Sequence, residues 1–327
     1  MNNAAFWRAV LERLDAGKPV FVALVVANTR GSPGTLGARL LIDAEGNTLG
    51  TIGGGIMEAN LVRAARDGLR AGNDASPTLQ ALEHRNKPGT AHPSGLICAG
   101  EQTNLNCWLK PERDAATIRA FCAALDADNR QSATLEIDAD GLRVVAGGDA
   151  SNGMRLDRDG ERWCWRESSV NSVRVAIIGG GHCGKALARL AADVGYRIEV
   201  FDTRDAALGD DTDWPANVRR VRLGDYVELP AHLHWPALTT VAVMTAAIVQ
   251  DIAALAVLAG MDLHWLGVMG SAAKIHEIRT QLAARGIAQE RIDAIHGPIG
   301  LPMKSDTPPE IAVSIVAQLL AERRGVD

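Results

Sequence analysis

The pattern of hydrophobic and polar residues predicts short strands and helices that alternate along the chain. Residues 4–16 carry apolar side chains at helical spacing, and the Gly-Lys-Pro segment 17–19 ends that pattern. Residues 20–27 form a continuous apolar run rich in β-branched side chains, which predicts a strand buried on both faces. Residues 39–43 and 48–52 predict a hairpin. This alternation is typical of the α/β class.

More elements follow in the same half of the chain. Residues 72–94 are polar and rich in Pro, Gly, Asn and Asp, so we expect a long irregular segment with His84 and His92 on its surface. The remaining elements predicted there are a strand at 103–109, a helix at 115–125 and a hairpin at 132–138 and 142–146.

A glycine-rich turn at residues 175–188 is the clearest functional pattern, because a predicted strand precedes it and a predicted helix follows it. Gly179 permits the sharp turn, Gly181 lets the backbone approach a ligand, and Gly184 lets the helix pack on the strand. The unpaired amides at the start of the helix suit a phosphate. The sequence therefore predicts an anion-binding turn in a Rossmann-like domain.

Two charged residues lie about 20 positions after this turn. Asp202 stands where such folds place a carboxylate on a ribose hydroxyl pair, and Arg204 adds a charge suited to a phosphate. His182 lies inside the turn itself. It is expected either to contact a ligand phosphate or to satisfy a polar group of the loop.

Two more glycine-rich turns precede predicted helices. Gly53, Gly54 and Gly55 follow the first hairpin, and with Arg30 and Ser32 close by in sequence we expect a polar ligand pocket. Gly270 and Ser271 follow a predicted strand at 264–269, and ligands of open α/β sheets bind at such carboxyl ends. The last helix has a capping box formed by Thr307 and Glu310 around Pro308 and Pro309.

Length and charge narrow the possibilities. The 327 residues suggest two domains: an α/β domain at 1–150 and a Rossmann-like domain at 173–327, joined by a linker at 151–172. The formal charge of −5 gives no electrostatic case for nucleic acid or an anionic membrane. Without an apolar run of spanning length or a signal-peptide pattern, we expect a cytoplasmic protein.

The five cysteines favour reduced thiols, because their number is odd and no CxxC pair is present. They are Cys98, Cys107, Cys122, Cys164 and Cys183. Cys98 lies next to a glycine at the start of a predicted strand, where a thiol can be exposed and reactive; Cys107 is expected to be packed.

No catalytic set is evident in the sequence. Hydride transfer needs a proton donor beside the substrate, and the chain also lacks GxSxG, HExxH and Walker motifs. The residues alone therefore favour a binding protein over a catalyst.

Several sequence blocks resemble the XdhC/CoxI family, the accessory proteins of xanthine dehydrogenase and related molybdenum hydroxylases. In chain order they are Arg30-Gly31-Ser32-Pro33, Gly50-Thr51-Ile52-Gly53-Gly54-Gly55 with Glu58, Ile97-Cys98-Ala99-Gly100, Gly179 to Gly184 with Asp202-Thr203-Arg204, Gly267 to Ser271, and Pro298-Ile299-Gly300-Leu301.

The resemblance implies a chaperone that binds the molybdenum cofactor (molybdopterin), protects it during sulfuration by a cysteine desulfurase and delivers it to an apo molybdenum hydroxylase. It also implies an N-terminal XdhC/CoxI-type α/β domain, a C-terminal Rossmann-like parallel-sheet domain and a homodimer. Cys98 matches the cysteine of the family's Cys-Gly-Gly block and becomes the candidate contact to molybdenum or its sulfur. The other cofactor-binding residues implied are Arg30, Ser32, Gly53, Gly54, Gly55, Glu58, Gly179, Gly181, His182, Gly184, Asp202, Arg204, Gly270 and Ser271.

The chain departs from the common family pattern at several positions. Ala99 replaces a glycine beside Cys98, Gly34 lies where a basic residue is usual, Ala246 replaces a histidine, and Ala272 replaces an arginine. Two other hypotheses stand beside the chaperone: an NAD(P)-dependent oxidoreductase, and a structural partner of a hydroxylase whose pocket holds no ligand.

Overall fold

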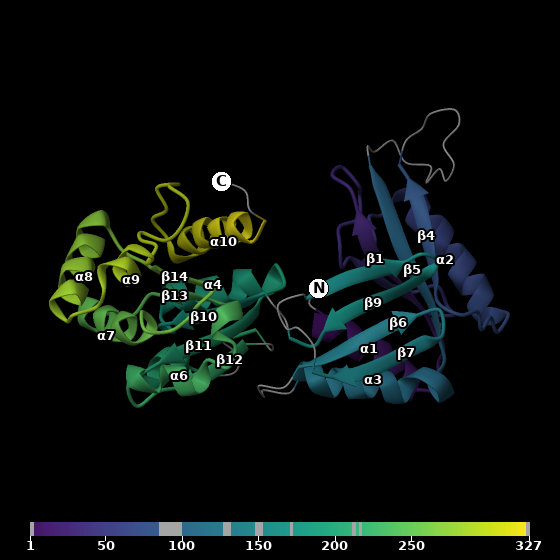
Figure 1. Ribbon diagram of the computed structural model, residues 1–327, viewed down its shortest axis with the longest axis horizontal. Helices are drawn as coiled ribbons and strands as arrows, with labels where there is room; N and C mark the ends of the chain where they lie inside the picture. Colours follow the sequence, from purple (N-terminus) through teal and green to yellow (C-terminus); the bar gives the residue numbers. More distant parts are fainter. Residues whose placement is uncertain are drawn as a thin grey trace. The chain divides into compact units, whose positions relative to one another are not determined.

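The computed structural model describes residues 3–84, 100–126, 132–147, 153–170, 173–210, 214–215 and 218–324. The chain divides into two compact units, Met1–Asn171 and Ser172–Asp327, each with its own sheets and core (Figure 1). The mixed α/β class predicted from the sequence is confirmed. None of the helices in the described ranges is long and apolar enough to cross a membrane.

The first unit is built around β1 (Val20–Asn28), the central strand of a five-stranded antiparallel sheet with the order β3-β2-β1-β5-β4. Seven consecutive residues of β1 are buried, as its continuous apolar run predicts. The other strands are β2 (Arg39–Ile42), β3 (Thr48–Thr51), β4 (Thr78–Glu83) and β5 (Glu101–Leu109). Helix α2 (Gly55–Arg70) packs on one face through Met57, Ala65 and Leu69.

The opposite face of this sheet shares a core with α1 (Asn3–Asp15), α3 (Pro111–Asp126) and a second, four-stranded antiparallel sheet. That sheet has the order β7-β6-β9-β8, with β6 (Ala133–Asp138), β7 (Gly141–Ala146), β8 (Met154–Asp159) and β9 (Arg162–Ser168). The expected linker at 151–172 therefore differs from the structure, since β8 and β9 pair with each other and β9 pairs with β6.

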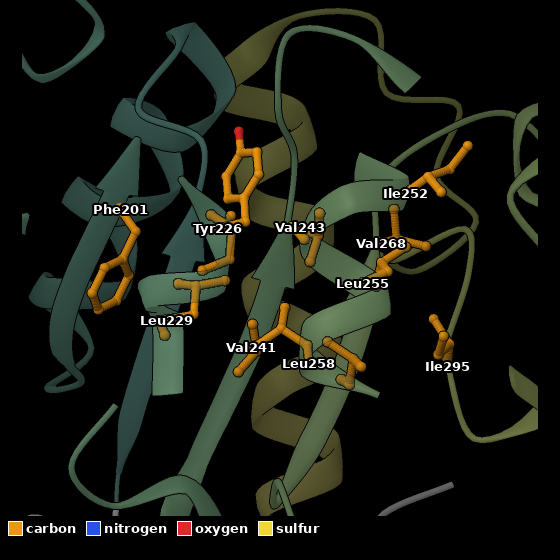
Figure 2. Packing of buried hydrophobic residues seen from close by; sticks show 14 of the residues in the cluster. Phe201, Tyr226, Leu229, Val241, Val243, Ile252, Leu255, Leu258, Val268 and Ile295 are labelled. Carbon is orange, nitrogen blue, oxygen red and sulfur yellow. The ribbon is translucent and has the colours of Figure 1, made fainter. Parts of the chain in front are cut away.

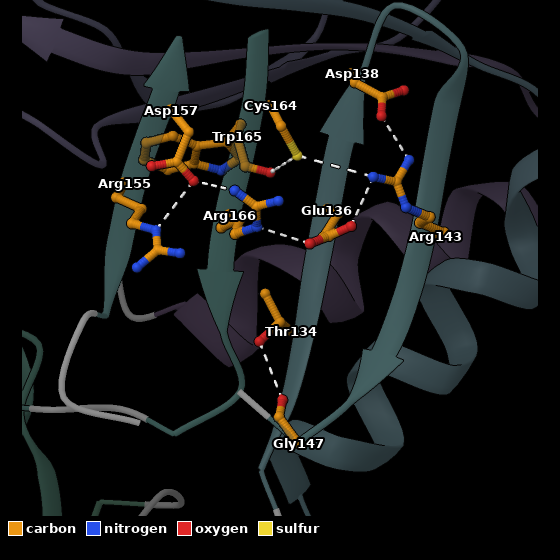
Figure 3. Close-up of polar contacts among 10 residues, drawn as sticks. All are labelled: Thr134, Glu136, Asp138, Arg143, Gly147, Arg155, Asp157, Cys164, Trp165 and Arg166. Carbon is orange, nitrogen blue, oxygen red and sulfur yellow. Dashed lines mark hydrogen bonds and ion pairs between the residues drawn. The ribbon is translucent and has the colours of Figure 1, made fainter. Parts of the chain in front are cut away.

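Charged side chains form a ladder across the second sheet (Figure 3). Glu136 of β6 lies 2.6 Å from Arg143 of β7 and 2.7 Å from Arg166 of β9, and Arg166 also pairs with Asp157 of β8. These charges lower the mean hydropathy of β8 and β9 while the strands stay paired. The low hydropathy explains why their sequence resembles a linker.

A buried ion pair joins the two sheets of the first unit. Glu167 of β9 is fully buried and accepts hydrogen bonds from Arg39 Nη1 of β2 at 3.1 Å and from Trp7 Nε1 of α1 at 2.9 Å. A buried carboxylate is tolerated only with such partners. The contact fixes three elements to one another.

The segment 72–94, predicted to be irregular, contains a strand. Residues 78–83 form the edge strand β4, and His84, expected on the surface, is fully buried. Burial lowers the pKa of His84, and a hydrogen bond with Gln102 partly opposes that shift. His92 lies outside the described residues.

The second unit is a parallel sheet with the order β12-β11-β10-β13-β14. Its strands are β10 (Arg174–Ile178), β11 (Arg197–Asp202), β12 (Val218–Arg222), β13 (Thr239–Val243) and β14 (Trp265–Val268). This is the order of the first five strands of the 3-2-1-4-5-6 Rossmann sheet, in which the strand order reverses between β10 and β13. Ligands of such sheets bind outside the carboxyl ends at that point.

Helices cover both faces of the parallel sheet. On one face α4 (His182–Asp193) packs with α10 (Pro308–Arg324), and on the other α7 (Ile248–Leu258) and α8 (Ala272–Ala284) cover a core that includes Phe201 and Val243 (Figure 2). The predicted capping box of α10 is confirmed, because Glu310 Oε2 accepts the Thr307 amide at 3.1 Å. The short helices are α5 (Asp205–Leu208), α6 (Leu229–His232), α9 (Gln289–Asp293) and the 3₁₀ turns Tyr226–Glu228 and Pro236–Leu238.

Candidate functional site

The glycine turn of the second unit connects β10 to α4, and its three glycines have different surroundings. A Cβ on Gly179 would lie 2.3 Å from the carbonyl oxygen of Met244, and one on Gly184 would lie 2.0 Å from that of Gly179. A Cβ on Gly181 would meet no atom within 4 Å. Gly179 and Gly184 thus permit close packing, whereas Gly181 leaves open space at the start of α4.

Helix α4 begins without a side-chain cap, because its N-cap residue is Gly181. The 12-residue helix directs the positive end of its dipole and its first amides toward that open space. His182, the first helical residue, is exposed. The turn therefore has the geometry of a phosphate site.

Asp202 lies at the carboxyl end of β11 and is 2% exposed. Its carboxylate accepts the Gly180 amide at 2.8 Å, and three donors of Arg204: the amide at 2.9 Å, Nε at 3.0 Å and Nη2 at 2.8 Å. Burial raises the pKa of Asp202, but the hydrogen bonds from Arg204 and Gly180 outweigh it and lower the pKa overall. A carboxylate offers about four acceptor sites, so a ribose diol would have to displace Arg204.

A polar network at the ends of β13 and β14 was missed by sequence reasoning. Asp251, in the first turn of α7, is fully buried and accepts hydrogen bonds from Thr245 Oγ1 at 2.7 Å and the Thr245 amide at 3.0 Å. Its other oxygen lies 2.5 Å from Lys274 Nζ of α8. Ser271, the N-cap of α8, accepts the Lys274 amide at 3.2 Å, and Gly270 lies beneath the lysine side chain.

Tyr226 is a second group that the sequence did not single out. It follows β12, is 6% exposed, and burial raises its pKa while a hydrogen bond with Thr203 opposes that shift. The charges of Asp202, Arg204 and Asp251 also act on it. Ionisable groups at the ends of β11, β12, β13 and β14, or in the segments that follow them, therefore lie at the carboxyl edge of the sheet.

In the first unit, Gln102 of β5 connects the predicted binding blocks. Its Oε1 accepts from the Gly34 amide and from Ser32 Oγ, both at 3.1 Å, and its Nε2 donates to the carbonyl oxygen of Ile52 at 2.9 Å. A Cβ on Gly53 would lie 2.8 Å from the Gly34 nitrogen, and one on Gly100 2.7 Å from the Ser32 nitrogen. The structure therefore brings together the loop after β1, the turn before α2 and the residue that precedes β5.

Glu58 closes the Gly53–Gly55 turn on itself. Its Oε2 accepts from Thr51 Oγ1 at 2.7 Å and from the amides of Ile52 at 2.9 Å and Gly54 at 3.1 Å. Gly55 is the first residue of α2, and Arg30 is exposed. Because Glu58 already accepts the amides of Ile52 and Gly54, the glycine turn of the second unit is the more open of the two turns.

Cys98, the predicted contact to the metal, lies outside the described residues. Cys107, Cys122, Cys164 and Cys183 are free thiols. Burial raises the pKa of the Cys122 thiol to about 11 and also raises that of Cys183. In the described ranges, no cluster of three His, Cys, Asp or Glu side chains has the arrangement of a metal site.

Two of the surface hollows are lined wholly by described residues. One, of about 260 Å³, is lined by residues that include Leu258, His264 and His296. The other, of about 460 Å³, lies beside the loop after β1 and includes Asn28 and Leu36.

Each unit contains a segment that matches a known protein family. Residues 175–319 match the XdhC Rossmann domain, and residues 13–80 match the XdhC and CoxI family. The chain belongs to the XdhC and CoxI family. This confirms the resemblance read from the sequence blocks and the Rossmann fold of the second unit.

Two known proteins are similar to this chain over nearly its whole length. The chain is 26% identical over 314 residues to the uncharacterized protein YqeB of Escherichia coli K12, a match that covers 94% of this chain and 44% of that protein. A crystal structure described as a xanthine dehydrogenase from Bacillus halodurans has a TM-score of 0.72 and 19% identity, and the match covers 100% of this chain and 97% of that one. The second similarity shows a shared fold along the whole chain.

Proposed function

We propose that this protein is a maturation factor that binds the molybdenum cofactor, protects it during sulfuration and delivers it to an apo molybdenum hydroxylase. Membership in the XdhC and CoxI family supports the maturation role. The observation that carries the binding step is the open space at Gly181, directly before the uncapped start of α4. Molybdopterin ends in a phosphate, and this is the kind of group that such a turn binds.

The residues of the turn fit a terminal phosphate on physical grounds. Gly181 has no side chain to obstruct it, and the first amides of α4 supply donors. Asp202 fixes the loop through Gly180, so the donors keep their positions before the ligand arrives. When bound, the cofactor would supply the metal and its sulfur chemistry, and the first amides of α4 would hold its phosphate.

Cys98 is the residue we propose for contact with the metal or its sulfur, since a thiolate is a soft ligand. A cysteine desulfurase as sulfur donor and a homodimer as the working form belong to the same proposal. Retention of the cofactor by a Cys98→Ala variant should fall, while Cys164→Ala, which changes a half-buried thiol of β9, should retain it as the parent does. Equal retention in the two variants would remove Cys98 from the proposal.

The experiment that tests the binding step mixes the purified protein anaerobically with free molybdenum cofactor, separates the mixture by gel filtration and assays molybdenum and pterin in the protein peak. NADH is run in parallel. Pterin and molybdenum eluting with the protein support the proposal. NADH retained without pterin would favour an NAD(P)-dependent oxidoreductase, and retention of neither would favour a structural partner of a hydroxylase.

A further inference from the structure

Lys274 places a cation at the carboxyl edge of the parallel sheet. It is the third residue of α8, and three residues separate this helix from the end of β14. Its side chain folds back over Gly270, where a Cβ would lie 2.6 Å from Lys274 Cδ, and Nζ donates to the carbonyl oxygen of Met269 at 3.0 Å. Side chains on a helix tilt toward its N-terminus, which accounts for this direction. The ammonium group therefore lies at the sheet edge.

The position is electrostatically unfavourable for a lysine unless anions are close. The first turn of a helix carries the positive end of the dipole, so a cation there is repelled by the backbone amides. Asp251, fully buried, supplies one compensating charge at 2.5 Å and is itself fixed by Thr245. An ammonium has three N–H donors; one is donated to the Met269 carbonyl oxygen, and the contact with Asp251 is an ion pair.

The side chain of Lys274 is also 25% exposed, so a ligand can reach the remaining N–H. β14 is separated from β10 only by β13, and neighbouring strands lie about 4.8 Å apart, which puts the ends of β10 and β14 about 10 Å apart. Ala272 stands where the family resemblance implies arginine, leaving Lys274 as the basic side chain of the first turn of α8.

We propose that Lys274 binds a second anionic group of a ligand whose phosphate occupies the turn at Gly179–Gly184. Asp251 and Thr245 act as positioning residues that hold the ammonium at the sheet edge. This proposal rests on the proposed function and extends it: the ligand bears two negative groups, one at the end of β10 and one at the end of β14. Inorganic phosphate alone satisfies the turn but does not use Lys274.

The test compares dissociation constants for free molybdenum cofactor by anaerobic equilibrium dialysis. Lys274→Met leaves Asp251 buried and uncompensated, and this alone destabilises the fold. A double variant, Lys274→Met with Asp251→Asn, removes both charges together. Arg285→Met removes one positive charge from the far end of the same helix and serves as the control.

We expect the double variant to bind the cofactor about tenfold more weakly than the parent, as for loss of one charge-assisted hydrogen bond. Its affinity should also depend less steeply on salt, while Arg285→Met and the conservative Lys274→Arg stay within about threefold of the parent. Parental affinity in a folded double variant would overturn the role of Lys274 and leave the proposed function intact. A parent that binds no cofactor would overturn both.

Discussion

Asp202 of β11 accepts the amide of Gly180 at 2.8 Å, so the end of β11 holds the glycine turn that follows the neighbouring strand β10. The same carboxylate binds Arg204 through three donors. A residue that commonly contacts a ribose is engaged here within the protein. The pair Asp202–Gly180 thus sets the shape of the turn before any ligand binds.

Asp202→Asn should destabilise the second unit by about 1–3 kcal/mol at pH 7, because a charged acceptor of four hydrogen bonds is lost. The folded-state pKa of Asp202 is lowered, so its contribution is complete above the unfolded pKa of about 3.9 and is lost as pH falls through the folded value. Urea unfolding from pH 7 to pH 2 should show the difference between parent and variant shrinking on acidification. A constant difference in stability across that pH range would contradict a stabilising role of the Asp202 charge.

The glycines of the turn should respond differently to alanine. Gly184→Ala should cost about 2–3 kcal/mol or prevent folding, because its Cβ would lie 2.0 Å from the Gly179 carbonyl oxygen. Gly181→Ala meets no atom within 4 Å, so it should lose only the about 0.5–1 kcal/mol that alanine costs at the N-cap of a helix. Thermal unfolding of the two variants measures the contrast. Similar losses in both would mean that the space at Gly181 is not open.

Gln102→Ala should destabilise the first unit by about 1–3 kcal/mol, because buried donors and acceptors in the loop after β1 and the turn before α2 would lose their partner. Gln80→Ala on the neighbouring strand β4 is the matched control, since Gln80 is exposed. Limited proteolysis and urea unfolding of the full chain provide the measurements. Equal stability of the two variants would show that Gln102 does not hold these segments together.

Arg39→Met should cost about 3 kcal/mol, because it leaves the fully buried Glu167 without its charged partner. Arg8→Met breaks an ion pair with Asp126 in which both side chains are about half exposed, and should cost less than about 1 kcal/mol. Guanidinium unfolding distinguishes the two variants. A lower stability of the Arg8 variant would contradict the claim that the buried Arg39–Glu167 pair stabilises the contact between the two sheets.

Local patterns predicted much of the fold. The strand-turn-helix at residues 175–188 and the capping box of α10 depend on neighbouring residues, and both occur in the structure. The edge strand β4 and the charged strands β8 and β9 were not predicted from the sequence. β4 has several exposed residues, and β8 and β9 carry the charged ladder of Figure 3, so neither region shows the apolar run that marks a buried strand.

The candidate site was predicted in part, for a similar reason. The spacing of the glycines predicts their role. The partners of Asp251 lie just after β13 and in α8, and they meet only because the sheet order places β13 beside β14. Gln102 likewise joins segments that are 50 to 70 residues away in sequence. The one available signal was an acid in the first turn of a helix that follows a buried strand.

The most direct test of the central claim is cofactor retention by Gly181→Glu. The substitution fills the open space before α4 with a side chain of the same charge as a phosphate. Gly260→Glu, just beyond the far end of α7, adds the same charge away from the turn. After anaerobic gel filtration with free molybdenum cofactor, the parent and Gly260→Glu should retain molybdenum and pterin, and Gly181→Glu should lose at least about nine-tenths of both, a tenfold effect. Equal retention by a folded Gly181→Glu variant would contradict the claim that this turn binds the cofactor.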